Sequence, residues 1–283
     1  MEVLSREILA PRIARLVVKA PAIAAKAEPG HFVVVRLNER AERIPLTIAD
    51  FDRDKGTITL IVQEVGKSTA LINRMNPGDF FADVLGPLGT PYPISRLGTV
   101  VGVAGGLGAA PLYPKVKALH EAGNRVIVIL GAQRQELLIL MDELKAISDQ
   151  LLVATDDGSY GQKGLVTEPL RQVLDMEPVD EVIAIGPVPM MDACCKLTRE
   201  RNVKTVVSLN AVMVDGTGMC GGCRVTVGGQ TKFCCVDGPS FDGLAVDFAE
   251  LRQRQRYYNE QEKQAYQRLL DSDGMEGCRC RAK

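Results

Sequence analysis

Three cysteines and an aspartate near the end of the chain have the spacing of a metal-cluster site. Four residues separate Asp215 from Cys220, two separate Cys220 from Cys223, and Cys235 follows after eleven more. Plant-type [2Fe–2S] clusters are bound by thiolates spaced C-x4-C-x2-C, with a fourth cysteine further along the chain. The motif therefore predicts a [2Fe–2S] cluster with a carboxylate, Asp215, in the first ligand position.

Other uses of these residues remain open from the sequence. A structural zinc site usually has paired CxxC motifs or histidines, whereas the second half of this motif is the adjacent pair Cys234 and Cys235. Adjacent side chains point in different directions, so we do not expect both to bind one cluster. A set of buried thiols without metal is a further alternative, and Asp215 alone would be an ordinary turn residue.

A glycine-rich turn follows the apolar run Thr99–Ala104 and precedes a predicted helix from about Ala110 to Ala122. Glycines at such a turn let the pyrophosphate of a dinucleotide approach the backbone N–H groups at the helix start. Tight packing of the helix on the sheet is the alternative reason for glycine. The predicted cofactor-binding residues here are Gly105, Gly106, Gly108 and Pro111.

A second turn, after the predicted strand Leu151–Thr155, carries Asp156, Asp157 and Gly158. Carboxylates at the C-terminal end of a strand accept hydrogen bonds from an adenosine ribose and repel a 2′-phosphate. The turn therefore favours NAD over NADP, although a solvated turn has the same composition.

Two segments in the first third of the chain have residue types that bind a flavin pyrophosphate. An arginine stands before one predicted strand, and a hydroxyl-rich segment opens a predicted helix, where N–H groups attract phosphate. Each segment alone is also an ordinary turn or cap. The predicted flavin-binding residues are Arg43, Pro45, Leu46, Thr47, Gly66, Lys67, Ser68 and Thr69.

The elements that must position these residues follow two patterns. Up to residue 96, short β-rich runs alternate with Gly/Pro turns, which predicts a small antiparallel β-barrel. Beyond it, apolar strands alternate with helices, which predicts an α/β domain with a doubly wound parallel sheet. We expect an FAD-binding barrel at 1–96, an NAD-binding α/β domain at 97–212, a [2Fe–2S] lobe at 213–243 and a C-terminal helix and tail at 244–283.

Two further helices are predicted, at Gln135–Ile147 and, long and charged, at Leu244–Leu270. Apolar residues in the long helix recur near heptad spacing, which favours a mixed interface with a partner or packing on its own domain. Beyond it, Cys278 and Cys280 are not assigned a metal. The apolar stripe consists of Leu244, Phe248, Leu251, Tyr258, Ala265 and Leu269.

The composition of the 283 residues disfavours several classes of function. A net charge of −1 and a pI near 6.2 argue against binding to nucleic acid or to an anionic membrane. No run of 18 apolar residues and no leader-like segment occurs, so we expect a soluble cytoplasmic protein with reduced thiols. The only histidines are His31 and His120, which disfavours a Ser–His hydrolase.

In this order, the segments resemble the ferredoxin–NADP reductase-like electron-transfer subunits. The aspartate in the first cluster position resembles one branch, the small (alpha) subunits of NADH-dependent ferredoxin:NADP oxidoreductases, which are electron-bifurcating transhydrogenases similar to sulfide dehydrogenase small subunits. Electron-transfer subunits of type B dihydroorotate dehydrogenase carry cysteine there. The shared segments are Pro29–Phe32, Arg43–Thr47, Gly66–Thr69, Gly86–Gly89, Gly105–Pro111, Thr155–Gly161, Gly186–Met190 and Cys235–Pro239.

The resemblance implies FAD, NAD(H) and a [2Fe–2S] cluster as cofactors, and it selects Cys235 rather than Cys234 as the fourth ligand. It implies that hydride passes from NADH to the flavin and single electrons pass on to the cluster, so no side chain is expected to be catalytic. Gly186, Pro187 and Met190 are implied on the nicotinamide side of the site.

The resemblance further implies a heterodimer with a larger flavoprotein subunit that carries iron–sulfur clusters and gives access to ferredoxin and NADP(H). Two positions depart from the family: Arg43 stands one residue further from Thr47 than in related reductases, and His31 replaces a glutamine. The alternatives are an electron-transfer subunit of type B dihydroorotate dehydrogenase or of a sulfide dehydrogenase, an adaptor without nicotinamide binding, and a metal-stapled binding module without flavin.

Overall fold

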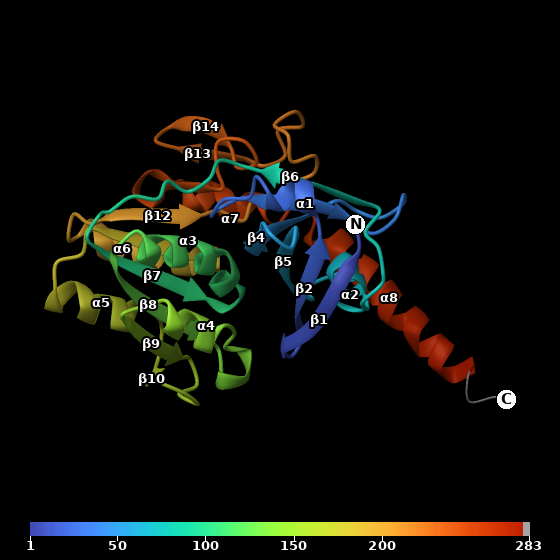
Figure 1. Cartoon of the computed structure of the whole chain (residues 1–283), viewed down its shortest axis with the longest axis horizontal. Helices are drawn as coiled ribbons and strands as arrows, with labels where there is room; N and C mark the ends of the chain where they lie inside the picture. Colours follow the sequence, from blue (N-terminus) through green and yellow to red (C-terminus); the bar gives the residue numbers. More distant parts are fainter. Residues whose placement is uncertain (280–283) are drawn as a thin grey trace.

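The computed structural model describes residues 1–279, with side chains described up to residue 272. The chain forms an antiparallel barrel, a parallel α/β unit beside it, and a small lobe over the junction of the two (Figure 1). This is the fold class predicted from the sequence.

The barrel is a six-stranded sheet in which apolar residues alternate with polar ones along the strands. In β5, for example, Ile58, Leu60 and Val62 are buried in the barrel core. The sheet closes where Glu2 forms a β-bridge with Phe80. The order is β1-β2-β5-β4-β3-β6, with β1 (Val3–Ala10), β2 (Ile13–Lys19), β3 (Phe32–Arg36), β4 (Ile44–Asp52), β5 (Thr57–Gln63) and β6 (Asp83–Leu88), and with helices α1 (Pro21–Ala24) and α2 (Lys67–Asn73).

The α/β unit is a seven-stranded sheet whose central strands are buried on both faces, as near-continuous apolar runs require. All its strand pairs are parallel except β12 with β15. The order is β10-β9-β8-β7-β11-β12-β15, so the direction of winding changes between β7 and β11. The strands are β7 (Thr99–Gly105), β8 (Arg125–Ala132), β9 (Gln150–Thr155), β10 (Gln162–Lys163), β11 (Glu181–Ile185), β12 (Lys204–Ser208) and β15 (Ser240–Asp242), and the helices are α3 (Ala109–Glu121), α4 (Met141–Ala146), α5 (Thr167–Met176) and α6 (Val188–Arg199).

The small lobe carries the Asp215 motif and a two-stranded hairpin of β13 (Arg224–Val227) and β14 (Gln230–Phe233). Three short 3-10 helices lie at Gly106–Gly108, Gln135–Leu137 and Gly243–Ala245. The chain then forms α7 (Phe248–Arg254) and α8 (Asn259–Arg279), which projects from the body in Figure 1.

The helix predicted at Gln135–Ile147 is wrong as a continuous element. A 3-10 turn covers Gln135–Leu137, and an α-helix resumes only at Met141. Leu140, between them, has φ +58°, a left-handed conformation that interrupts helical hydrogen bonding. Apolar periodicity continues through this break, and for that reason the pattern did not reveal it.

The continuous helix predicted at Leu244–Leu270 is also wrong. Its first part is a 3-10 turn and α7, where Phe248 and Leu251 are buried in the core of the α/β unit. A turn follows before α8, and Tyr258 there is exposed. The front of the apolar stripe therefore packs on the chain's own fold, and α8 contacts the barrel through Tyr266.

Strand β1 shows no clear apolar alternation, because most of its side chains are exposed. No helix in the described part of the chain is long and apolar enough to cross a membrane. The side chains of Cys278 and Cys280 lie outside the described residues.

Candidate functional site

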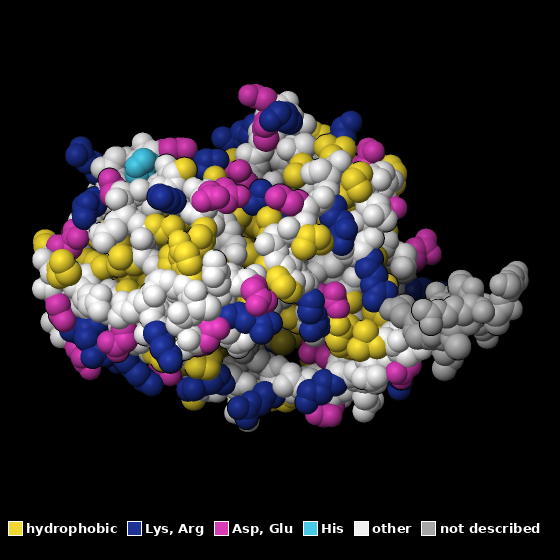
Figure 2. Space-filling view, turned by 90° about the horizontal axis from the view of Figure 1, so that it is seen from below, with side chains coloured by type: hydrophobic (Ala, Val, Ile, Leu, Met, Phe, Trp, Pro, Cys, Tyr) yellow, Lys and Arg dark blue, Asp and Glu magenta, His cyan; other side chains and the backbone are white. Residues whose placement is uncertain are grey.

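A cavity of about 1010 Å³ lies between the barrel and the α/β unit. In Figure 2 a hollow with hydrophobic side chains in its depth opens between the two halves of the molecule. Its walls come from β4 and β5, from the turns that follow β7, β8, β9 and β11, and from residues 208–213. Open α/β sheets bind ligands at this edge, beyond the carboxyl ends of the strands. The predicted residues that line it are Pro45, Leu46, Thr47, Gly105, Gly106, Gly108, Pro111, Asp156, Gly186, Pro187 and Met190.

The glycine-rich turn after β7 fits a bound dinucleotide. A Cβ atom at Gly108 would lie 2.1 Å from the carbonyl oxygen of Ile185, so helix α3 approaches β11 closely. At Gly106, with φ +55°, no atom lies within 4 Å of the Cβ position, and the space is open. The 13-residue helix α3 begins directly after this turn. Its unpaired N–H groups can bind the pyrophosphate of a nucleotide.

The two carboxylates of the acidic turn have different surroundings: that of Asp156 faces the cavity, and that of Asp157 bonds within the turn. Asp156 lines the cavity. Asp157 Oδ1 instead accepts hydrogen bonds from the Ser159 hydroxyl at 2.6 Å and the Ser159 N–H at 2.9 Å, and these bonds lower the Asp157 pKa. Gly158 packs against Lys163 and does not line the cavity. Only Asp156 is therefore placed to meet a ribose.

The barrel contributes one of its two predicted flavin segments to the cavity. Residues Pro45–Thr47 of β4 line it, and Thr47 pairs with Phe32 of β3, which lines it as well. The segment offers an apolar surface with a single hydroxyl, as a flavin ring and its ribityl chain require.

The other flavin segment lies apart from these residues. Arg43 and Gly66–Thr69 are not among the residues that line the cavity. The Ser68 hydroxyl donates a hydrogen bond to the Glu42 carboxylate, so a negative charge already lies beside the start of α2. In this structure the start of α2 is therefore less suited to a phosphate than the sequence indicated.

The four predicted cluster ligands lie in one loop region as two pairs. Cys223 Sγ lies 3.2 Å from Cys235 Sγ, and Cys220 Sγ lies 3.3 Å from Asp215 Oδ1. Among the described residues, no three His, Cys, Asp or Glu side chains converge as a single metal ion would require. Together the two pairs would supply the four ligands that a [2Fe–2S] cluster needs.

Backbone N–H groups surround these ligand atoms. Those of Thr217, Met219 and Cys220 donate to the Asp215 carboxylate at 3.1–3.2 Å, and the Thr217 bond is the main cause of a lowered Asp215 pKa. The Gly222 N–H donates to Cys220 Sγ at 3.4 Å. Such outer hydrogen bonds orient metal ligands and hold them in the charged form.

Burial has the opposite effect on Cys235. Burial, and after it the neighbouring Cys223, raises the pKa of this thiol to about 12. A metal ion would relieve this penalty, because it favours the thiolate at both positions. Cys234 is also buried, but its thiol interacts with the backbone of Ala211 and lies outside both pairs. The arrangement favours Cys235 over Cys234 as the fourth ligand.

The ligand loop packs on the strand that also borders the cavity. A Cβ atom at Gly216 would lie 2.8 Å from Val34 Cγ2 and 4.0 Å from the ring of Phe32, both on β3. Beyond β6, the Thr90 hydroxyl donates to the Val236 carbonyl oxygen at 2.8 Å. Since Phe32 also lines the cavity, the two candidate sites share one strand.

Sequence reasoning missed several residues that line the cavity. Lys115 is buried in the wall and donates hydrogen bonds to the Ser208 and Ser240 hydroxyls. Gln133 and Asn210 contribute polar groups. No local motif marks these residues, because long-range packing brings them to the cavity.

Comparisons with known proteins agree with this geometry. A family model described as the iron–sulfur cluster binding domain of dihydroorotate dehydrogenase B matches residues 210–247. A second, described as the oxidoreductase NAD-binding domain, matches residues 103–196. The first range contains the ligand loop, and the second contains the glycine-rich and acidic turns.

Similar proteins cover most of the chain. A Thermotoga maritima protein described as a homolog of the electron transfer subunit of dihydroorotate dehydrogenase B (NAD(+)) is 50% identical over 257 residues, 91% of this chain and 91% of its own length. The corresponding subunit of Geobacillus thermodenitrificans is 36% identical over 250 residues, 85% of this chain and 95% of its own. A chain from the structure of an NADH-dependent reduced ferredoxin-NADP oxidoreductase is 47% identical, with a TM-score of 0.91, and the match covers 95% of this chain and 97% of that one.

The fold and the site define an NAD-binding oxidoreductase with an iron–sulfur domain. The chain belongs to the family of electron transfer subunits of dihydroorotate dehydrogenase B and their homologs. The predicted family resemblance, the oxidoreductase class and the binding of NAD and an iron–sulfur cluster are thereby confirmed.

Proposed function

We propose that the chain is the FAD- and [2Fe–2S]-containing, NAD(H)-binding subunit of an NADH-dependent ferredoxin:NADP oxidoreductase. One observation carries the proposal: the nucleotide turns and the barrel line a single cavity, and the Asp215 loop packs on the strand that borders it. The solved relative is described in terms of flavin-based electron bifurcation. When bound, the nicotinamide and flavin supply hydride transfer, and the cluster supplies one-electron transfer.

The chain's own residues bind and orient the cofactors and exclude water from the site. Gly105–Gly108 and the start of α3 hold the NAD(H) pyrophosphate, Asp156 accepts hydrogen bonds from its ribose, and Gly186–Met190 borders the nicotinamide. Pro45–Thr47 hold the flavin, with Arg43 and Gly66–Thr69 as its outer contacts. The division into a barrel (1–96), a nucleotide domain (97–212), a cluster lobe (213–243) and a C-terminal region (244–283) follows these roles. The cluster ligands are Asp215, Cys220, Cys223 and Cys235.

The subunit works as one half of a heterodimer in the cytoplasm. Its partner is a larger flavoprotein with iron–sulfur clusters, through which electrons reach ferredoxin and NADP(H). Relatives named as electron transfer subunits support a separate catalytic partner. The side chains of Val214, Met219 and Val236 are exposed beside the ligand loop, and they give that partner an apolar contact near the cluster.

A second candidate is the electron transfer subunit of a type B dihydroorotate dehydrogenase. The family model for residues 210–247 and the named relatives favour it. A sulfide dehydrogenase subunit is a further possibility within the same architecture. The partner that co-purifies from the native host separates the three, because each has a different large subunit.

Anaerobic reduction of the purified chain tests the cofactor assignments. NADH should bleach a bound flavin and then reduce the cluster, with a higher kcat/KM than NADPH. Asp156→Ala should reduce this preference, because the variant no longer offers a carboxylate to the ribose or repels a 2′-phosphate. A colourless protein, or NADPH efficiency equal to that of NADH in the wild type, would contradict the proposal.

A further inference from the structure

Lys115, in the middle of α3, is a buried lysine without a carboxylate partner. Its side chain is 1% exposed. Its ammonium donates to the hydroxyls of Ser208 and of Ser240, the latter at 2.8 Å. Among the described residues, no carboxylate lies within ion-pair distance of it. A buried cation with only neutral acceptors is costly unless an opposite charge compensates it.

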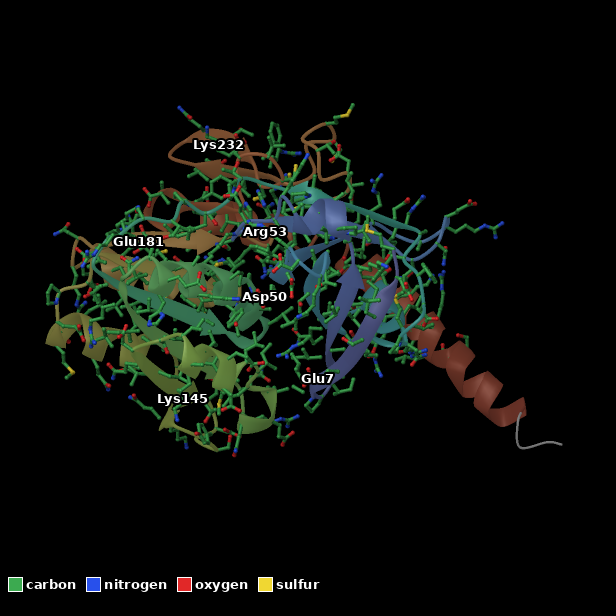
Figure 3. All side chains as sticks on the ribbon, in the orientation of Figure 1. Glu7, Asp50, Arg53, Lys145, Glu181 and Lys232 are labelled. Carbon is green, nitrogen blue, oxygen red and sulfur yellow. The ribbon has the colours of Figure 1, made fainter. Side chains whose placement is uncertain are left out.

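One carboxylate, Glu181, attracts the Lys115 ammonium, but it is committed to other groups. Glu181, at the start of β11 (labelled in Figure 3), accepts a hydrogen bond from the Tyr92 hydroxyl and pairs with Lys204. The Tyr92 ring centroid lies 5.4 Å from Lys115 Nζ. Burial lowers the pKa of Lys115 to about 7, and the attraction of Glu181 only partly opposes this. The flavin-free protein therefore holds a lysine whose charge is poorly compensated.

The position of Lys115 is at the barrel end of the cavity. A Cβ atom at Gly30 would lie 3.5 Å from Lys115 Cε, and Gly30 and Phe32 line the same wall. Phe32 pairs with Thr47 of the flavin segment. Among the described residues that line the cavity, only Lys115 and Asp156 are charged. They lie toward opposite edges of the parallel sheet: Lys115 bonds to Ser208 of β12, and Asp156 follows β9. A single positive charge thus lies at the flavin end and a single negative charge at the nucleotide end.

We propose that Lys115 stabilises the negative charge that the flavin ring gains on reduction. A hydride that leaves C4 of the nicotinamide breaks the C–H bond, carries both electrons to flavin N5 and leaves NAD⁺. The flavin ring, neutral before, then holds one negative charge. Lys115 acts as a positioning and electrostatic residue, because it donates no proton in this step. Since it presupposes FAD in this cavity, the inference rests on the proposed function.

Two substitutions separate the charge of Lys115 from its hydrogen bonds. Lys115→Met removes both, and the variant should fold because replacing a buried charge by an apolar side chain of similar size is often neutral or stabilising. Lys115→Gln keeps a donor for the serine hydroxyls but carries no charge. Lys117→Met is the matched control, since Lys117 lies on the same helix and pairs with Asp50 at 3.3 Å outside the cavity lining.

The measurement is a spectroelectrochemical titration of the bound flavin in the full chain. In both Lys115 variants we expect the ratio of reduced to oxidised flavin at a fixed potential to fall at least tenfold, which is about 30 mV for a two-electron couple. Lys117→Met should match the wild type. A wild-type potential in Lys115→Gln would show that Lys115 only ties α3 to β12 and β15, and it would overturn the inference. Absence of flavin from the wild type would instead overturn the proposed function, and the inference with it.

Discussion

At the scale of single residues, the candidate site combines scarce charge with dense backbone hydrogen bonding. Lys115 and Asp156 are the charged residues among the described residues that line the cavity. Lys115 is buried, so its substitution changes the local potential more than it would on a surface. The ligand loop is the reverse, because amide groups converge on the Asp215 carboxylate and keep it ionised. Neighbouring groups therefore set the charge state at both places: serine hydroxyls around Lys115 and backbone N–H groups around Asp215.

The adjacent cysteines give a direct test of the ligand assignment. Cys235→Ser should lose the cluster or change its EPR spectrum strongly, because Cys235 Sγ forms a pair with Cys223 Sγ. Cys234→Ser should keep the wild-type spectrum, because that thiol lies outside both ligand pairs. Iron content and EPR of the dithionite-reduced proteins measure the difference. The opposite pattern would assign Cys234 as the ligand.

The lowered pKa of Lys115 predicts how the stability of the flavin-free protein changes with pH. Lysine in the unfolded chain titrates at its ordinary pKa of 10.5, whereas in the folded chain it titrates at about 7. Between these values the unfolded state binds the extra proton, so stability rises with pH. Relative to Lys115→Met, the wild type should gain on the order of 1 kcal/mol per pH unit from pH 7 to 10.

Urea unfolding of the two flavin-free proteins at several pH values measures this gain. In the difference between the two unfolding free energies, the titration of all groups that both proteins share cancels. A constant difference between pH 7 and 10 would mean that Lys115 stays charged in the folded protein.

At the scale of elements, regular apolar patterns predicted most strands and helices, while interruptions escaped the pattern. The glycine-rich turn, α3 and the strands around them could be predicted because their signals are local. The break at Leu140 could not, because a left-handed leucine is stabilised by packing and has no sequence signature. The turn between α7 and α8 likewise interrupts a stretch, residues 244–270, that contains no Gly or Pro to mark a break.

The close approach of α3 to β11 makes Gly108 a sensitive position. In Gly108→Ala, the new methyl group would meet the Ile185 carbonyl oxygen, so the start of α3 must move away from the strand. A shift of this size in the pyrophosphate-binding turn should lower kcat/KM for NADH by about 100-fold. Stopped-flow bleaching of the flavin by NADH measures it.

Gly106→Ala is the contrasting variant. Its Cβ position is open, and the cost there is the left-handed conformation, about 1–2 kcal/mol. It should therefore lose less activity than Gly108→Ala while keeping α3 in place. Equal losses in the two variants would show that helix placement is not what limits the reaction with NADH.

At the scale of the whole molecule, the order of the motifs predicted the architecture. The sequence did not show which motifs line the same cavity, because that depends on the three-dimensional fold. Lys115, Ser208 and Ser240 come from α3, β12 and β15, and only the fold brings them together. Helix α8 extends beyond this body (Figure 1). It contacts the barrel through Tyr266, whose hydroxyl donates to the Glu64 carboxylate. The ligand loop is the other outlying part, and Met219 at its tip is 89% exposed.

An exposed methionine beside a cluster ligand predicts where the partner flavoprotein docks. The few residues that dominate an interface lie near its centre and cost more than about 1 kcal/mol each when they are replaced. Met219→Asp should therefore weaken the heterodimer about tenfold or more, which corresponds to about 1.4 kcal/mol. Bleaching of the chain's own flavin by NADH should not change, since Met219 does not line the cavity. An unchanged EPR spectrum would show that the cluster is intact.

Met176→Asp is the matched control for this experiment. Met176 is 83% exposed at the end of α5, on the α/β unit, so its substitution adds the same charge to an equally accessible methionine. Calorimetric titration with the co-purified partner compares the affinities. If only Met219→Asp weakens binding, the partner covers the ligand loop, and electrons leave the chain there. If both variants bind like the wild type, the partner docks elsewhere, and α8 becomes the surface to substitute next.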